Sequence, residues 1–313
     1  MKKIEMATIF KMEQKELKAY LYERLIESHG EENVINASGY LYAKGTHPVL
    51  LVAHMDTVHK TPLSQLFYSE DGTMAMAKEG IGGDDRCGVI IILDILEKLK
   101  CSVVVCEDEE IGGVGAKKFC SDNLDLDVNY AVEFDRKGSN DYVFYKDYNE
   151  KFAEFIEKFG FEKASGSMSD ISKIAPAYKI EAVNLSSGYY NAHTAHEYVC
   201  FDEMADITER ATAMIAEPTK KWEYVEAKPV VYSYPKYTSW DWSQYYAPQM
   251  FLSPTLYSIL RNGKAVKFDR AWMKSSGEVI VDKYAGKPLK GDVIVCDRVT
   301  GMQVDYNDIC LWY

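Results

Sequence analysis

The chain has 313 residues, more than a usual single domain, and 47% of them are hydrophobic, which is ample for a core. Its formal net charge of −12 argues against nucleic acid as a partner, because phosphate binding requires clustered lysine and arginine. The seven cysteines lack CxxC spacing, no apolar signal region follows Met1, and no apolar run has the length of a membrane span. We therefore expect a reduced, cytoplasmic protein without a membrane partner, and the sequence leaves oligomerisation open.

Helical and strand-like segments alternate along the first two thirds of the chain. Apolar residues recur at helical spacing in 14–28, whereas the short apolar run 102–106 is typical of a buried strand. This alternation predicts an α/β fold, a mostly parallel central sheet with helices on both faces. The expected helices span 14–28, 87–99, 112–120, 150–159 and 202–216, the last capped by Asp202, and the expected strands span 34–43, 48–53, 102–106, 130–134 and 179–185.

The pattern changes after residue 217. Residues 220–249 are rich in tyrosine and tryptophan, which at this density form a small core more often than a binding face. We therefore expect an α/β domain at 1–217 and a small β-rich domain of undefined role at 218–313. Its expected strands, separated by glycine- and aspartate-containing turns, lie at 264–268, 277–284, 291–299 and 302–313.

Five short polar segments of the α/β part end a strand-like run or lie in a loop. In an open α/β sheet, ligands bind beyond the carboxyl ends of the strands, where most of these segments fall. Imidazole and carboxylate donors in this ratio suit zinc, with cobalt or manganese as substitutes, and the set could hold two divalent cations and a hydrolytic water. The segments are 54–56, 83–86, 109–110, 134–135 and 193–197.

Two divalent cations roughly 3.5–4 Å apart need one bridging carboxylate and about two terminal ligands each. Asp84 is the expected bridge between them. The expected terminal ligands are two imidazoles and two carboxylates, namely His54, His193, Glu110 and Asp135.

Two further side chains have expected roles beside the metals. Glu109 adjoins a ligand without being one, so it can act as the base that takes a proton from the water. Asp56, two residues after His54, can accept the other ring proton of that imidazole and fix its tautomer. We therefore predict that Glu109 and Asp56 belong to the catalytic machinery.

The residue pattern alone leaves rivals for two of the ligands. Glu133 competes with Asp135, because the alternation along one strand does not choose between them, and His196 competes with His193. His59 lies close enough to the His54 segment to remain of interest.

The segments resemble the motifs of the co-catalytic dizinc exopeptidases, the clan that includes peptidase T, the tetrahedral aminopeptidases and glutamate carboxypeptidase. This resemblance covers about residues 1–217, selects Asp135 and His193 over their rivals, and makes Glu109 the general acid/base. It implies that His54 and Asp135 bind opposite metals, with Asp84 as the bridge. It also implies a cis peptide bond after the bridging Asp84. The matching motifs are Ala53–Val58, Gly83–Gly88, Glu107–Gly112 and Asn191–Glu197.

The chain departs from many members of that clan between Asp135 and His193. These residues are separated by 58 positions, which the expected helices and strands already occupy, so no lid domain fits there. Within this stretch, Ser165–Asp170 resembles the small-residue loop that borders the substrate in relatives, and it reads equally well as a turn with Asp170 capping the next helix.

The resemblance implies a two-metal hydrolase of amide bonds, an aminopeptidase acting on short peptides. Aspartate at position 135 favours this activity, because carboxypeptidase and deacylase relatives tend to have glutamate there. One alternative is an N-acyl-amino-acid deacylase with the same site. Another is a non-catalytic peptide-binding protein that retains its metals, against which the presence of Glu109 argues.

Overall fold

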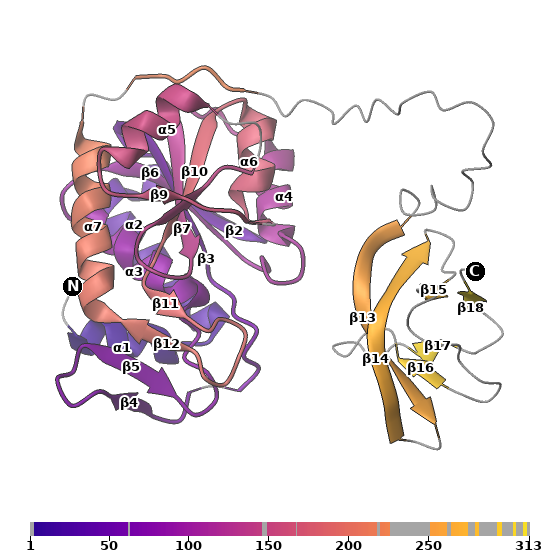
Figure 1. Cartoon of the computed structure of the whole chain (residues 1–313). Helices are drawn as coiled ribbons and strands as arrows, with labels where there is room; N and C mark the ends of the chain where they lie inside the picture. The colour runs from indigo at the N-terminus through magenta and orange to yellow at the C-terminus, as the bar shows by residue number, and fades with distance from the viewer. Residues whose placement is uncertain are drawn as a thin grey trace, which may run out of the picture. The chain divides into compact units, whose positions relative to one another are not determined.

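The computed structural model describes residues 3–61, 63–145, 149–166, 168–217 and 220–225, together with the strands of the C-terminal region. The chain divides into two compact units, Met1–Val230 and Val231–Tyr313 (Figure 1). Trp222 of the first unit packs against the rings of Phe152 and Phe155, with centroids 5.4 Å away in both cases. Part of the aromatic stretch at 220–249 thus belongs to the first unit, while 226–249 lies outside the described residues.

An eight-stranded sheet forms the centre of the first unit, in the order β1-β2-β6-β3-β7-β10-β8-β9. The four middle strands, β6, β3, β7 and β10, run parallel, which confirms the expected fold class. The strands are β1 (Val34–Ala37), β2 (Tyr40–Ala43), β3 (His47–His54), β6 (Cys101–Cys106), β7 (Tyr130–Arg136), β8 (Asp141–Val143), β9 (Glu162–Lys163) and β10 (Glu181–Ser186).

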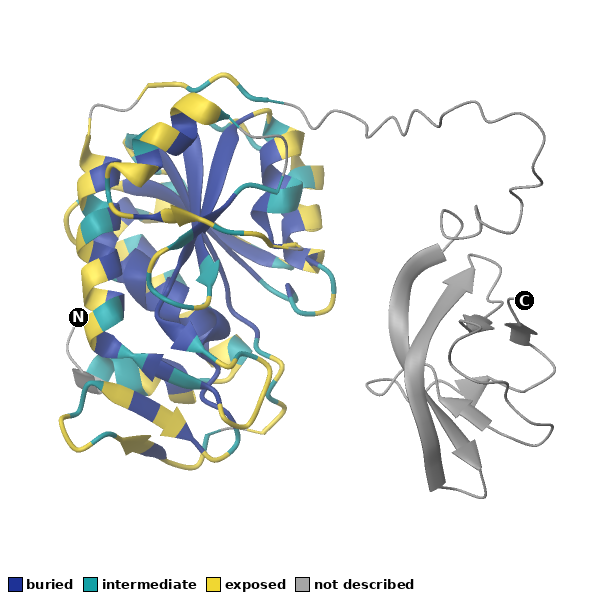
Figure 2. Cartoon of the chain, viewed as in Figure 1, coloured by how far each residue is buried: buried dark blue, intermediate teal, exposed yellow. Residues whose placement is uncertain are grey.

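Helices cover both faces of this sheet because successive strand side chains point to opposite sides. In β3, Val49 and Leu51 join one buried cluster, whereas Leu50 and Val52 join the other. Figure 2 shows the central strands as mostly buried. The first cluster includes side chains of α1 (Lys3–Lys11), α2 (Gln14–His29), α3 (Gly83–Leu96), α5 (Glu150–Glu157) and α7 (Phe201–Ala216), and the second those of α4 (Val114–Asp122) and α6 (Ile171–Tyr178). A short 3-10 helix, η1 (Glu31–Asn33), precedes β1. None of the helices described is long and apolar enough to span a membrane.

A second, four-stranded sheet in the order β11-β12-β5-β4 was not expected from the sequence. Its register pairs Tyr198 with Met76, so residues far apart in the chain lie side by side. This pairing brings the loop 191–197 to the start of α3, where two candidate ligands meet. The strands are β4 (Leu66–Tyr68), β5 (Met74–Ala77), β11 (Tyr189–Tyr190) and β12 (Tyr198–Cys200).

Three local expectations are corrected by the structure. Residues 34–43 form a hairpin of β1 and β2 rather than one strand, since Gly39 adopts a φ of 96° in the turn. Asp202 is not the N-cap of α7, because the helix begins at Phe201 and Cys200 occupies the cap position. Asp170 lies at the N-cap of α6 but makes no capping hydrogen bond through its side chain.

The second unit contains a six-stranded sheet in the order β17-β16-β13-β14-β15-β18. All its pairs are antiparallel except β15 with β18. A β-rich C-terminal region was expected, although β13 was not. The strands are β13 (Phe251–Arg261), β14 (Lys264–Lys274), β15 (Val279–Val281), β16 (Val293–Val295), β17 (Gln303–Val304) and β18 (Ile309–Leu311).

Candidate active site

The polar segments meet at the carboxyl edge of the parallel strands. His54 is the last residue of β3, Asp135 lies near the end of β7, and Glu109 and Glu110 occupy the turn after β6. Asp84 follows Gly83 at the start of α3, where its backbone is not yet helical and its peptide bond to Asp85 is cis, as the motif resemblance implied. The loop between β11 and β12 supplies His193.

One set of donor atoms, the buried group, consists of His54, Asp84 and Asp135. The Nε2 atom of His54 lies 3.2 Å from Oδ1 of Asp84 and 3.8 Å from Oδ1 of Asp135. The three donor atoms lie within 4.8 Å of one another, and His54 is fully buried. These side chains could hold one metal ion. The expectation that His54 and Asp135 bind opposite metals was therefore wrong, because β3 and β7 are adjacent parallel strands that bring both side chains to the same place.

A second set, the outer group, consists of Asp84, Glu110 and His193. The Nε2 atom of His193 lies 3.1 Å from Oδ2 of Asp84 and 3.0 Å from Oε1 of Glu110. Asp84 therefore offers one oxygen to each group, which is the arrangement of a bridging carboxylate. The His193 side chain is 53% exposed, so this group faces the solvent.

The electrostatics of both groups favour a cation. Burial would lower the pKa of His54, but its hydrogen bonds to Asp135, Asp56 and Asp84 outweigh burial and raise it well above the usual value. Hydrogen bonds to Asp84 and Glu110 raise the pKa of His193 to about 10. Burial, reinforced by the charge of Asp84, holds the pKa of Asp135 well above its ordinary range. Crowded carboxylates and imidazoles of this kind fit divalent cations, and no thiolate is needed.

Asp56 connects the buried group to the turn after β6. Its Oδ1 lies 3.2 Å from Nδ1 of His54 and accepts a hydrogen bond from the Glu109 N–H at 3.0 Å. Its Oδ2 accepts another from the Glu110 N–H, also at 3.0 Å. Burial raises the pKa of Asp56, but the hydrogen bonds from His54 and the two N–H groups outweigh it and lower the pKa. Asp56 can thus orient His54 and the turn after β6 together.

Glu109 lies beside both groups without belonging to either. It is 7% exposed, and burial raises the pKa of its carboxyl group, with Glu110, Asp84 and Asp56 adding to the rise. A carboxylate with a raised pKa is a stronger base than one at the surface.

The structure also separates the rivals. Glu133 is fully buried and accepts a hydrogen bond from Ser169, while His196 is exposed on its loop. Neither residue belongs to the two donor groups found among the described residues.

Asp85 and Glu197 are two further buried carboxylates that support the candidate ligands. No role was expected for either side chain from the sequence. Asp85 is fully buried, and its oxygens accept hydrogen bonds from the N–H groups of His54 at 3.3 Å and Gly88 at 3.1 Å. Glu197 accepts hydrogen bonds from the N–H groups of Asp84 at 3.0 Å and Gly82 at 2.9 Å. Its Oε2 also lies 2.7 Å from Nε2 of His59. Glu197 therefore holds the turn that presents Asp84.

An open pocket of about 480 Å³ lies over the donor groups and Glu109. The Ser165–Asp170 loop contributes Ser165, Gly166 and Met168 to its wall, and Lys137 and Tyr145 line it as well. This loop therefore borders the same pocket as the carboxylates of the donor groups.

Many solved structures are similar to the chain, among them three peptidases. The TET aminopeptidase from the marine sediment archaeon Thaumarchaeota archaeon SCGC AB-539-E09 has a TM-score of 0.56 and 12% identity, covering 69% of this chain and 97% of that one. Aminopeptidase PepT from Bacillus cereus ATCC 10987 has a TM-score of 0.54 and 16% identity, and the match covers 67% of this chain and 96% of that one. A tripeptidase from Staphylococcus aureus subsp. aureus Mu50 has a TM-score of 0.53 and 13% identity, covering 67% and 95%. At such identities the similarity establishes the fold.

No curated protein matches the sequence. The family model of peptidase family M28, in contrast, matches residues 33–196, more than half of the chain. The matched stretch contains both donor groups as well as Asp56 and Glu109. The chain therefore belongs to peptidase family M28 and is a metal-dependent exopeptidase of the dizinc exopeptidase clan.

Proposed function

We propose that the protein is an aminopeptidase that hydrolyses short peptides at a centre of two metal ions, most suitably zinc, with cobalt or manganese as substitutes. The observation that carries this proposal is the sharing of Asp84 by the two donor groups, each with its own histidine, beside Glu109. His54 and Asp135 would hold one ion, and Glu110 and His193 the other, with Asp84 between them.

The metal ions, when bound, would polarise the scissile carbonyl group and lower the pKa of a water molecule. Glu109 would accept a proton from that water and afterwards donate it to the departing amine. Asp56 would keep the ring of His54 and the N–H groups of Glu109 and Glu110 in position through the hydrogen bonds described above.

The aminopeptidase assignment rests on Asp135 and on the names of two similar structures, which are aminopeptidases, while a third is a tripeptidase. An N-acyl-amino-acid deacylase would use the same centre and differs in needing an acylated substrate. A non-catalytic peptide-binding protein is disfavoured by the placement of Glu109. We further propose that residues 1–217 carry the activity and that the protein is cytoplasmic, consistent with free thiols at all described cysteines.

A substrate panel tests the assignment. The metal content of the purified chain should be measured beside hydrolysis of aminoacyl amides, short peptides and their N-acetylated counterparts, with zinc, cobalt or manganese added in turn. Two metals per chain and cleavage only of free amines support the proposal. Cleavage only of acetylated substrates would make the protein a deacylase, and metal binding without any turnover would support the peptide-binding alternative.

A further inference from the structure

We propose that a cavity beside Arg86 is a second binding site, for a small organic acid or phosphate that presents an oxyanion. The cavity has a volume of about 320 Å³ and lies among the α1–α2 turn, the loop after β3 and the start of α3. None of the five proposed metal ligands belongs to its wall, although Asp56 does. The site is therefore separate from the substrate pocket.

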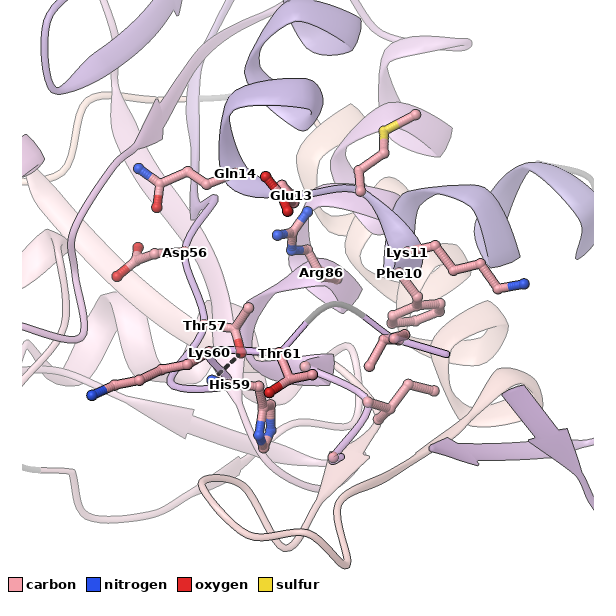
Figure 3. A pocket seen from close by; sticks show the side chains of 15 residues that line it. Phe10, Lys11, Glu13, Gln14, Asp56, Thr57, His59, Lys60, Thr61 and Arg86 are labelled. Carbon is pink, nitrogen blue, oxygen red and sulfur yellow. Dashed lines mark hydrogen bonds between the residues drawn. The ribbon is translucent and has the colours of Figure 1, made fainter. Parts of the chain in front are cut away.

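Arg86 is the main observation behind this inference. Its side chain is almost completely buried, at 2% exposure, and Figure 3 shows its guanidinium directed into the cavity. Within the described part of the chain, its one hydrogen bond is a long 3.5 Å contact from Nη1 to the Ile9 carbonyl, and Nε has no partner. A buried charge without a partner is strongly unfavourable, so the guanidinium needs an anion.

The nearby acidic groups do not supply that anion. Both oxygens of Asp56 are engaged by His54 and by the N–H groups after β6, and both oxygens of Asp85 accept backbone N–H groups. Glu13 lines the cavity but is exposed, and no carboxylate among the described residues forms an ion pair with Arg86. The charges of Asp56 and Asp85 attract the guanidinium from a distance, but the interior end of the cavity presents a buried cation without an ion-pair partner among the described residues.

The remaining charges of the wall favour the same ligand. Lys11 and Lys60 are exposed and extend outward on opposite sides in Figure 3, so cations outnumber acids around the cavity. A guanidinium pairs with carboxylate or phosphate oxygens through two parallel hydrogen bonds, a geometry that matches both ligands. A metal cation or an apolar molecule would leave Arg86 unpaired. The volume leaves room for an organic group attached to the oxyanion.

A crystallographic experiment on the unaltered chain locates the ion directly. Crystals of the metal-loaded protein would be soaked in selenate, whose selenium gives an anomalous signal. We expect an anomalous peak within hydrogen-bonding distance of the Arg86 guanidinium. Peaks only at the metal centre or at surface lysines, with water beside Arg86, would overturn the proposal.

Calorimetric titration with acetate and with inorganic phosphate, at an ionic strength held constant with sodium chloride, measures the affinity in solution. Arg86→Lys keeps the charge but loses the paired donors of the guanidinium. It should therefore raise the dissociation constant of the anion at least about tenfold. The control Arg210→Lys, at a surface ion pair with Asp206, should leave it unchanged. Saturable binding of acetate alone would identify a carboxylate ligand. Saturable binding of phosphate alone would identify a phosphate ligand. Equal affinity of wild type and Arg86→Lys, with metal content unchanged, would contradict the proposal.

Discussion

The two donor groups share Asp84 but are built from different kinds of structure. His54 of the buried group ends a central strand, is inaccessible to solvent, and is held through its ring by Asp56 and through its backbone by Asp85. His193 of the outer group lies in a loop between two strands of two and three residues, and about half of its side chain is exposed. The buried group is therefore part of the core, whereas His193 of the outer group lies on a loop at the surface.

This difference predicts that the two donor groups respond differently to mutation. Ligands that are fixed by buried hydrogen bonds keep their geometry. Removing one such ligand leaves the buried charges of its partners without compensation. A solvent-facing ligand can be removed with little damage to the fold. The following predictions use this contrast.

His54→Ala should have the largest effect. It removes the imidazole that pairs with Asp56 and Asp84, so we expect loss of the metal of the buried group, loss of activity, and a decrease of roughly 3 kcal/mol in the free energy of unfolding. Metal analysis and urea unfolding of the chelator-treated proteins measure these effects. An unchanged unfolding midpoint would show that the buried group does not contribute to the core.

His193→Ala should remove one metal per chain and most of the activity with much less effect on the fold. Because the side chain is half exposed, we expect the free energy of unfolding to change by less than about 1 kcal/mol. His196→Ala, on the same exposed loop, is the matched control and should retain both metals. If His196→Ala lost the metal instead, the ligand assignment would move to His196.

Asp56→Asn should weaken metal binding without removing a ligand. Loss of the charge on the side chain that orients His54 is expected to lower metal affinity by roughly 10–100-fold, measured by competition with a chelator. Asp71→Asn, in the exposed turn before β5, serves as the control. Equal affinities of the two variants would mean that Asp56 does not position the ligand.

Glu107→Gln should have the smallest effect, and the effect should depend on pH. Burial raises the pKa of Glu107, but hydrogen bonds from Lys18, the Gly39 N–H and Gln14 outweigh it, so the folded pKa is lowered. The resulting stability is present above the unfolded pKa and is lost as the pH falls through the folded pKa.

We therefore expect Glu107→Gln to reduce the free energy of unfolding by about 1 kcal/mol at pH 7 and by less at about pH 3, below the unfolded pKa of the carboxyl group. Chemical unfolding at both pH values measures this difference. The control Glu70→Gln, at an exposed position, should match wild type at both. A pH-independent difference would contradict the stated origin of the stability.

Features with a local sequence signal were predictable. The apolar runs located β3, β6 and β7, and the polar residues that follow them indicated His54, Glu109 and Asp135. The motif resemblance added the cis bond after Asp84, which the structure contains.

Features that depend on long-range pairing were not predictable. The strands β11 and β12 are too short to give a periodic signal, and β12 pairs with a strand more than a hundred residues earlier. The support that Glu197 gives to Asp84 follows from that pairing. The burial of Asp85 and Arg86 was equally hidden, because charged residues at the start of a helix are usually exposed.

We propose that Glu109 acts as the base at a two-metal centre. Glu109→Gln keeps the size of the side chain and removes its ability to accept a proton, so metal content and turnover of this variant should be measured on the same sample. We expect two metals per chain, as in wild type, and a rate at least about 100-fold lower. Turnover close to wild type with both metals bound would contradict it.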